Sequence, residues 1–283
     1  MKFENLSVII PTYNRAPLLE RAMASVLSQT VLPREMIIID DGSDDQTGHL
    51  VKRTEDLSDV KILYHKQRNR GPASARNRGI EMSSSAFLAF LDSDDHWHKR
   101  KIEIQFRELI KNNHRRISHT REKWFRRGEH LNQKKIHLPP DGNIFSSCLK
   151  LCCVGMSTVM VNRSIFDDYG LFDETLRCCE DYDYWLRVSA VEDFLLIDVP
   201  LTIKEGGRDD QVSVIYRVGM DKYRIYSLSK LVAQGNLNPE QKLQARKMLI
   251  EKCEIYGRGC LKHGKSIEGE AVLELARKNR SIE

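Results

Sequence analysis

Long apolar runs are missing from this chain of 283 residues. No stretch approaches the roughly 20 apolar residues that a helix needs to cross a bilayer. The sequence contains no Gly-x-Gly-x-x-Gly pattern, which disfavours a dinucleotide oxidoreductase, and neither a Walker loop nor a Ser-His-Asp order is present. A strand is expected almost directly after the first residues, which leaves no room for a secretory signal. We therefore expect a cytoplasmic protein.

Cysteine is scarce and its number is odd, with seven residues in the chain. Such a set without an export signal favours reduced thiols. Cys148, Cys152 and Cys153 together with Cys178-Cys179 could hold zinc, but their spacings match no common zinc module. We expect buried or incidental thiols, because free cysteine behaves as a small hydrophobic residue.

The net charge of +5 is modest but unevenly spread. In the segment 111–135, nine Lys and Arg residues face only Glu122 and Glu129. Nucleic acid, an anionic membrane surface or a diphosphate-bearing acceptor could bind such a patch. The alternative is an ordinary solvated loop and helix face.

Short apolar runs alternate with helical periodicity over the first 110 residues. Strands are expected at 6–10, 36–39, 60–64 and 87–91, with helices at 18–27, from 44 onward, at 71–82 and at 99–111. Ser43 is the expected N-cap of the second helix. This alternation predicts an α/β fold with a mostly parallel sheet, right-handed crossovers and flanking helices.

The second half of the chain is less regular. Strands are expected at 157–162 and 194–197, and a helix at 180–190. Gly206-Gly207 indicates a flexible loop, and the pattern after residue 215 is helical, with a turn at 236–239. The sequence therefore predicts one domain over 1–215 and a C-terminal helical extension over 216–283.

Carboxylates follow two of the predicted strands directly. Asp40-Asp41-Gly42-Ser43 follows 36–39, and Asp92-Ser93-Asp94-Asp95 follows 87–91. Ligands bind at the carboxyl edge of parallel sheets. Carboxylates gathered there would repel one another unless they share a cation or hydrogen-bond donors. A divalent metal that holds a phosphate-bearing ligand is the simplest solution, although each cluster alone could be an acidic strand-to-helix turn.

These clusters, taken with Val8-Ile9-Ile10-Pro11-Thr12-Tyr13-Asn14-Arg15 and Glu180-Asp181-Tyr182-Asp183-Tyr184-Trp185-Leu186-Arg187, resemble family 2 glycosyltransferases of the GT-A fold. The resemblance covers about residues 5–215. It implies an inverting enzyme of the bacterial surface-glycan type. Such an enzyme moves a sugar from a nucleotide-diphosphate donor, with UDP-sugar expected, to a hydroxyl acceptor in polysaccharide or glycolipid synthesis.

The resemblance also implies roles for individual residues. Asp181 is the expected general base and Glu180 its support, although two acids at a helix start also suit the helix dipole. Asp94, with Asp92, is the expected ligand of Mn²⁺ or Mg²⁺, which neutralises the departing diphosphate. The expected nucleotide- and donor-binding residues are Pro11, Thr12, Tyr13, Arg15, Asp40, Asp41, Arg76, Asp92, Ser93 and Arg208.

Two of these positions rest on particular arguments. Arg76 lies one turn into the helix that Gly71-Pro72 opens, where it can reach a diphosphate or hold the carboxylates of Asp40 and Asp92. Arg208 stands in a loop where relatives often carry a metal-binding histidine. Arginine does not ligate metals, but it can clamp a diphosphate directly, so weaker metal dependence is expected.

Two other function classes stay open from the sequence. One is a catalytically weak nucleotide-sugar or polyanion binding protein on the same scaffold. The other is a nucleotidyltransferase, which usually needs a Gly-rich basic loop after the first strand, where this chain has Pro11-Thr12-Tyr13-Asn14. Expected partners are a nucleotide-sugar donor and a glycan or lipid-linked acceptor, with peripheral contact to the inner membrane face through 111–135. The C-terminal helices suit a homodimer, and no nucleic acid is expected.

Overall fold

The structure, a computed structural model, describes residues 2–234 and 237–281. A mixed sheet forms its centre, with the strand order β3-β2-β1-β4-β8-β6-β9-β5 and with β7 paired to β6. The strands are β1 (Lys2–Thr12), β2 (Leu32–Asp40), β3 (Lys61–Lys66), β4 (Phe87–Phe90), β5 (His96–Trp97), β6 (Ile117–Arg126), β7 (Glu129–Leu131), β8 (Met160–Asn162) and β9 (Phe194–Gly206).

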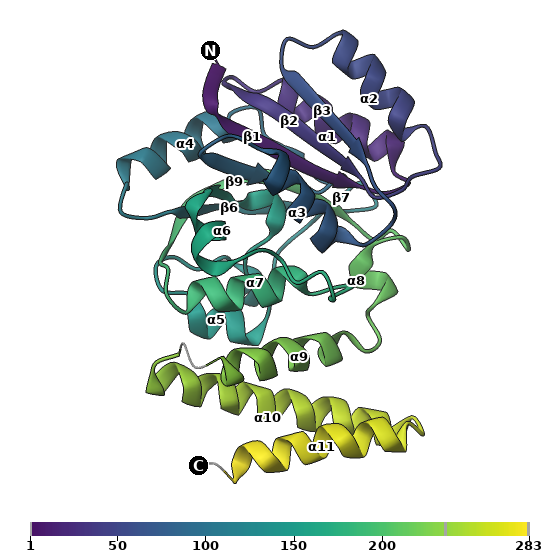
Figure 1. Ribbon diagram of the computed structural model, residues 1–283, viewed down its shortest axis with the longest axis vertical. Coiled ribbons are helices and arrows are strands. Elements are labelled where there is room, and N and C mark those ends of the chain that lie inside the picture. The colour runs from purple at the N-terminus through teal and green to yellow at the C-terminus, as the bar shows by residue number, and fades with distance from the viewer. Residues whose placement is uncertain (1, 235–236, 282–283) are drawn as a thin grey trace.

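Helices cover both faces of this sheet and continue beyond it. They are α1 (Ala16–Leu27), α2 (Thr47–Asp56), α3 (Pro72–Met82), α4 (Lys101–Lys111), α5 (Phe145–Lys150), α6 (Ser164–Tyr169), α7 (Glu180–Ser189), α8 (Val212–Ile215), α9 (Met220–Ala233), α10 (Pro239–Lys262) and α11 (Ser266–Arg280), with short 3-10 turns η1 (Lys135–His137) and η2 (Met156–Thr158). Figure 1 shows the two chain ends at opposite ends of the long axis, with α9, α10 and α11 stacked at the C-terminal end.

The first half of the sheet is parallel, as its βα alternation predicts. β1 pairs in parallel with both β2 and β4, and β2 pairs in parallel with β3. The central residues Val8–Ile10, Met36–Ile39 and Leu88–Phe90 are apolar because both faces of the sheet are buried there. Ile9 and Ile37 pack on the face that α3 and α7 cover, and their neighbours Val8 and Ile38 pack against α1. Adjacent side chains in a strand point to opposite faces of the sheet, so neighbouring residues belong to two separate cores.

The other half of the sheet differs from the prediction for 111–135. Ile117–Arg126 is strand β6, which pairs in parallel with β9 and antiparallel with β8, so the expectation of a solvated loop and helix face is wrong there. β9 is longer than the expected strand at 194–197 because it continues alongside β6 to Gly206. β6 contains the consecutive charged residues Arg121, Glu122 and Lys123, and this interruption hid the strand from an analysis of apolar runs.

The predicted N-cap of the second helix is also wrong. α2 begins at Thr47, and its first turn is bound by the carboxylate of Asp45, which accepts from the Thr47 amide at 3.0 Å. The Ser43 hydroxyl instead accepts a hydrogen bond from the amide of Asn14 at 2.8 Å. Ser43 thus joins the turn after β2 to the turn after β1. Asp45 lies closer to the helix and binds its first turn instead.

The C-terminal helices form a continuous stack on the α/β part. α9 contacts α7, α10 contacts α5 and α9, and α11 contacts α10. Asn238 caps α10 through a reciprocal capping box with Gln241, at the turn that the sequence predicts; Asn236 of that turn lies outside the described residues. Within the described residues 2–234 and 237–281, no helix is both long enough and apolar enough to span a membrane.

One glycine allows α3 to lie against the centre of the sheet. A Cβ atom on Gly79 would lie 2.4 Å from Cγ2 and 3.3 Å from Cγ1 of Ile9, whose side chain is fully buried. Isoleucine is branched at Cβ and has few alternative rotamers, so it has no room to move aside. The position of helix α3, which carries Arg76, therefore depends on the absence of a side chain at Gly79.

We expect Gly79→Ala to lower the free energy of unfolding by about 1–3 kcal/mol, the usual range for an overpacked core. Gly259→Ala is the matched control, because no heavy atom lies within 4 Å of the added Cβ in α10; it should raise stability by about 0.4–1 kcal/mol. Urea unfolding of both variants measures the difference. Equal stability of the two variants would show that α3 is free to shift.

Candidate functional site

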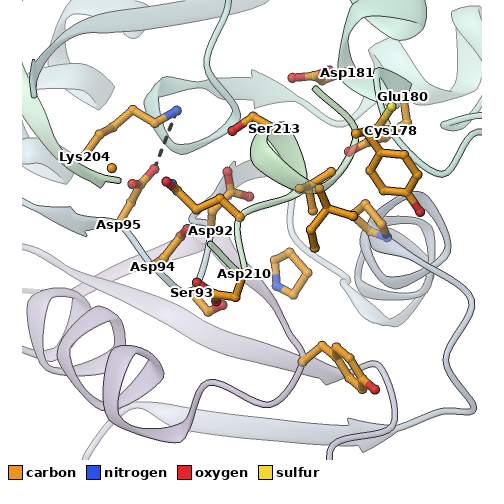
Figure 2. A pocket seen from close by; sticks show the side chains of 18 of the residues that line it. Asp92, Ser93, Asp94, Asp95, Cys178, Glu180, Asp181, Lys204, Asp210 and Ser213 are labelled. Atoms are coloured by element: carbon orange, nitrogen blue, oxygen red, sulfur yellow. Dashed lines mark ion pairs between the residues drawn. The ribbon is translucent and has the colours of Figure 1, made fainter. Parts of the chain in front are cut away.

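A cavity of about 740 Å³ opens at the carboxyl edge of the parallel strands. Register pairs Thr12 with Asp40, so the ends of β1 and β2 lie side by side. The turn after β4, the end of β9, the region of α8 and the start of α7 complete the wall. Figure 2 shows Asp92 to Asp95 on one side of this cavity, with Glu180 and Asp181 projecting from the side of α7.

Three carboxylates of the turn after β4 converge. One oxygen from each of Asp92, Asp94 and Asp95 lies within 4.8 Å of the others. The sequence predicts this proximity for Asp92 and Asp94, since side chains two apart in an extended segment point the same way. Asp95 is the unpredicted third member. Such an all-oxygen set fits a hard divalent cation such as Mg²⁺ or Mn²⁺.

Asp95 is buried beneath the cluster. Its Oδ2 accepts a hydrogen bond from the Ser157 hydroxyl at 2.6 Å, and the Lys204 ammonium lies 3.9 Å away. Burial raises the pKa of Asp95 well above its ordinary value, and Asp94 and Asp92 act in the same direction. Ser157 also accepts from the Asp92 amide at 3.0 Å. The 3-10 turn η2 thereby fixes both ends of the acidic turn.

Arg76 links the acidic turn to α7. Its guanidinium donates to Asp92 Oδ1 at 2.8 Å and, through the other terminal nitrogen, to Glu180 Oε1. Burial opposes the charge, but Asp92 and Glu180 outweigh it and raise the pKa of Arg76. Desolvation would raise the pKa of Asp92, yet Arg76 and Lys204 hold it below its ordinary value. Of the two carboxylates predicted for Arg76, it holds Asp92 and not Asp40.

Asp94 is bound by two arginines from different parts of the chain. Arg15 Nη1 lies 3.3 Å and Arg208 Nη2 lies 2.5 Å from Asp94 Oδ2. Both arginines also pair with Asp210, at 3.0 Å and 3.1 Å. The ion pair between Arg208 and Asp94 therefore ties the predicted Gly206-Gly207 loop to the acidic turn. Arg15 joins the same two segments indirectly, because it pairs with both Asp94 and Asp210.

Asp181 stands at the mouth of a second, smaller cavity of about 150 Å³ that adjoins the first. Its Oδ2 accepts from the thiol of Cys152 at 3.3 Å, and its Oδ1 accepts from the Tyr182 amide at 2.7 Å. Its neighbour Glu180 is buried, and burial raises the pKa of Glu180 although Arg76 opposes the change. Asp181 is thus the carboxylate of this pair that faces the open cavities.

Asp41 lines the cavity and organises its floor. One carboxylate oxygen accepts from the Gly71 amide at 2.7 Å, and the other accepts from the Arg70 amide at 2.9 Å. These bonds fix the loop that leads into α3. Gly71 has a φ of +92°, a conformation that favours glycine.

Asp40 lies behind the wall of the cavity and is not part of its lining. Its carboxylate accepts from the Ser43 amide at 2.7 Å and from the Tyr64 hydroxyl at 2.5 Å. It therefore shapes the turn after β2 from within. Arg208 is likewise not part of the lining, although it pairs with Asp94. The other predicted positions do line the cavity, and they are Pro11, Thr12, Tyr13, Arg15 and Ser93.

Several lining residues were not predicted from the sequence. Lys204 ends up between Asp95 and Glu122 because β9 extends much further than its apolar beginning indicates. Cys152 and the neighbouring Cys178 and Cys179 also line the cavity, and all seven cysteines are free thiols. No local signal marked Cys152, whereas the position of Lys204 two residues before Gly206-Gly207 could have indicated it.

Arg76 offers a direct test of this network. We expect Arg76→Met to lower the free energy of unfolding at neutral pH by about 3–5 kcal/mol, because two enclosed carboxylates lose their shared cation. Arg78→Met, on the exposed face of the same helix, should cost less than about 1 kcal/mol.

The deficit of Arg76→Met should shrink as the pH falls from 7 toward 5. Without the guanidinium, the pKa of Glu180 rises further above its unfolded value, so the folded state gains stability with each step toward acid. Denaturant titrations at several pH values measure this. A deficit that is independent of pH would show that the loss comes from packing and not from charge.

The model of the family described as "Glycosyl transferase family 2" matches residues 7–170. An uncharacterized glycosyltransferase of Rickettsia felis is 38% identical over 199 residues, which cover 70% of this chain and 32% of that protein. The chain thus spans about a third of that relative's length. The UDP-Glc:alpha-D-GlcNAc-diphosphoundecaprenol beta-1,3-glucosyltransferase WfgD of Escherichia coli is 33% identical over 186 residues, covering 65% of this chain and 69% of WfgD.

Solved structures share the fold at low sequence identity. S. aureus TarS 1-349 in complex with UDP-GlcNAc has a TM-score of 0.72 at 17% identity, covering 96% of this chain and 79% of that one. Mannosyltransferase PcManGT from Pyrobaculum calidifontis in complex with GDP-Man and Mn2+ has a TM-score of 0.65 at 16% identity, covering 98% and 82%. The predicted GT-A fold with C-terminal helices is confirmed. With the family model matched over more than half of its length, the chain belongs to glycosyltransferase family 2.

Proposed function

We propose that this chain transfers a sugar from a nucleoside-diphosphate donor, with UDP as the nucleotide, to a hydroxyl acceptor with inversion at the anomeric carbon. One observation carries the proposal. A single cavity brings together the end of β1, Asp41, the acidic turn at 92–95 and Asp181. These groups supply a surface for the nucleotide, carboxylates that can hold a divalent cation, and a base in one place.

The donor half of the cavity lies over the strand ends. The partly exposed ring of Tyr13 and the carboxylate of Asp41 suit a nucleobase and ribose hydroxyls. Asp94 and Asp92, with Asp95 beside them, would hold Mn²⁺ or Mg²⁺, and the bound ion supplies positive charge that neutralises the departing diphosphate. Arg15 and Arg208 lie beside the same carboxylates and bind the phosphate oxygens once the donor enters.

The acceptor half lies around Asp181. As the acceptor oxygen attacks the anomeric carbon, Asp181 takes the hydroxyl proton, and the bond between that carbon and the diphosphate breaks. Attack from the face opposite the diphosphate inverts the anomeric configuration. The Cys152 thiol and the Tyr182 amide orient the carboxylate, and Glu180, held by Arg76, fixes the start of α7.

The names of relatives support a donor and an acceptor class. WfgD is named for UDP-Glc and a diphosphoundecaprenol-linked sugar, and TuaG of Bacillus subtilis is named as a putative teichuronic acid biosynthesis glycosyltransferase. We infer by analogy a UDP-sugar donor, a lipid-linked or glycan acceptor and a role in the synthesis of bacterial surface polysaccharide. The GDP-Man and Mn2+ of the PcManGT complex make GDP and Mn²⁺ necessary members of any ligand panel.

Donor binding can be measured without knowing the acceptor. We expect UDP with Mn²⁺ at a hundredfold excess over its dissociation constant to stabilise the protein by about 2.7 kcal/mol. GDP, CMP and dTDP should have smaller effects. Asp94→Ala should remove the part of the stabilisation that requires Mn²⁺, whereas Asp193→Ala, at an exposed position before β9, should retain it. Stabilisation by UDP that is equal with and without Mn²⁺ would assign the charge-neutralising role to Arg15 and Arg208.

The general base can be tested separately. Asp181→Asn should lower turnover about 10²–10⁴-fold, because the proton acceptor is lost while the side chain keeps its shape. UDP binding should be unchanged, and Asp193→Asn should retain full turnover. The readout is UDP release with a panel of lipid-linked and free glycan acceptors. Full activity of Asp181→Asn would remove this carboxylate from the reaction.

The pairing of Asp94 with two arginines favours one alternative, a nucleotide-sugar binding protein with little catalysis. In that case the arginines would replace the metal permanently. Tight UDP-sugar binding, with neither sugar transfer nor donor hydrolysis across the acceptor panel, would support the alternative over the enzyme.

A further inference from the structure

Large apolar side chains are exposed on two segments beside the mouth of the cavity. We call these segments, 126–138 and 212–218, the rim. Ile136 is 60% exposed, Ile215 is 61% exposed and Val218 is 91% exposed. The other exposed apolar residues of the rim are Leu131, Leu138, Val212 and Val214. A cluster of this kind on a chain with an ordinary interior indicates an interaction surface.

The two rim segments border the same cavity. Leu131 from the first segment and Ile215 from the second both belong to its wall. β6 and β9 also pair as far as Arg126 and Gly206, so the start of the first rim segment lies beside the chain that leads into the second. Figure 1 shows β7 and α8 on the same side of the α/β part of the molecule, with α8 leading into α9.

Positive charge accompanies the apolar side chains on the rim. Arg126, Arg127, Lys134, Lys135 and Arg217 are exposed. Among the described residues, none of these five forms an ion pair within 4.0 Å, whereas Asp210 near the second segment is neutralised by Arg15 and Arg208.

The first half of the basic segment 111–135 differs in this respect. Arg115, Arg116 and Arg121 are paired with carboxylates of neighbouring elements, and Lys111 is paired with Glu108 of its own helix. Apart from Lys123 in β6, the basic residues of the segment that form no ion pair among the described residues therefore lie on the rim. The sequence alone assigned the charge to the whole segment.

We propose that the rim docks the protein onto an anionic lipid bilayer. The basic side chains contact lipid phosphates, and the apolar side chains enter the boundary between head groups and acyl chains. A soluble polyanion would satisfy the charges but would leave Ile136, Ile215 and Val218 in water. A second copy of the same surface would bring like charges together. Docked in this way, the cavity opens toward the membrane, and this last step rests on the proposed lipid-linked acceptor.

Vesicle binding tests the docking directly. We expect the full chain to sediment with vesicles of phosphatidylglycerol and phosphatidylcholine in equal parts, and to bind pure phosphatidylcholine far more weakly. Lys134→Glu/Lys135→Glu should weaken binding to the anionic vesicles at least about 25-fold, since each basic residue contributes about fivefold. Lys262→Glu/Lys265→Glu is the control, at exposed positions at the far end of α10.

The apolar contribution has its own variant pair. Ile136→Ser/Val218→Ser should weaken binding at least tenfold, and Ile267→Ser, which changes an equally exposed residue on α11, should leave it unchanged. Thermal unfolding shows whether each variant is folded. Neither Ile136 nor Val218 lines the cavity, so UDP binding in solution should be unaffected.

Three results would overturn the proposal. They are the absence of vesicle binding, equal binding to both vesicle types, and a charge-dependent binding that Ile136→Ser/Val218→Ser leaves intact. The last of these would identify the rim as a site for a soluble polyanion. Because UDP binding is measured separately, a failure of membrane docking is distinguishable from a failure of the proposed transferase activity.

Discussion

The bridge from Arg76 to Asp92 and Glu180 is the interaction on which the arrangement of the cavity depends. It joins three elements that are far apart in sequence: the helix α3, the turn after β4 and the start of α7. The parallel half of the sheet carries the first two, and the third belongs to the part of the chain that follows the antiparallel strands. Because the guanidinium is planar and donates from both ends, it fixes a direction as well as a distance. The position of Asp181 relative to the acidic turn follows from it.

The charges of the site are nearly balanced within the protein. Asp92, Asp94, Asp95, Glu180 and Asp181 face Arg15, Arg76, Lys204 and Arg208. Carboxylates at a sheet edge need a cation, and here much of that need is met by side chains. Two of the four cations, Arg15 and Arg208, lie in connections between elements and pair with Asp94. The other two lie on regular elements, since Arg76 belongs to α3 and Lys204 to β9.

The sequence alone predicted those strands in which a run of apolar residues coincides with burial in the sheet. The central residues of β1, β2 and β4 are buried, so their apolar runs were visible, and the carboxylates that follow β2 and β4 were placed at one edge. β6 was missed because it is stabilised by pairing with β9, which joins Ile117 to Phe194 and Arg126 to Gly206. Lys204 and Cys152 reach the cavity through that same pairing and through the turns beside it, and no local pattern encodes such positions. Asp40 is the opposite case. The local pattern predicted a binding role for it, but its carboxylate oxygens accept hydrogen bonds from Ser43 and Tyr64 inside the protein.

Ser157 has a consequence for how this protein can be recombined. Its hydroxyl accepts from Asp92 and donates to Asp95, and its carbonyl oxygen accepts from the Trp97 indole at 2.8 Å and the Thr202 hydroxyl at 3.0 Å. One small residue in the middle of the chain therefore sets the shape of a turn 60 residues earlier. A chimaera that takes its first hundred residues from one family member and the rest from another must keep a hydroxyl at this position. Exchange of acceptor specificity between relatives is consequently constrained at a residue that touches neither substrate in the proposed arrangement.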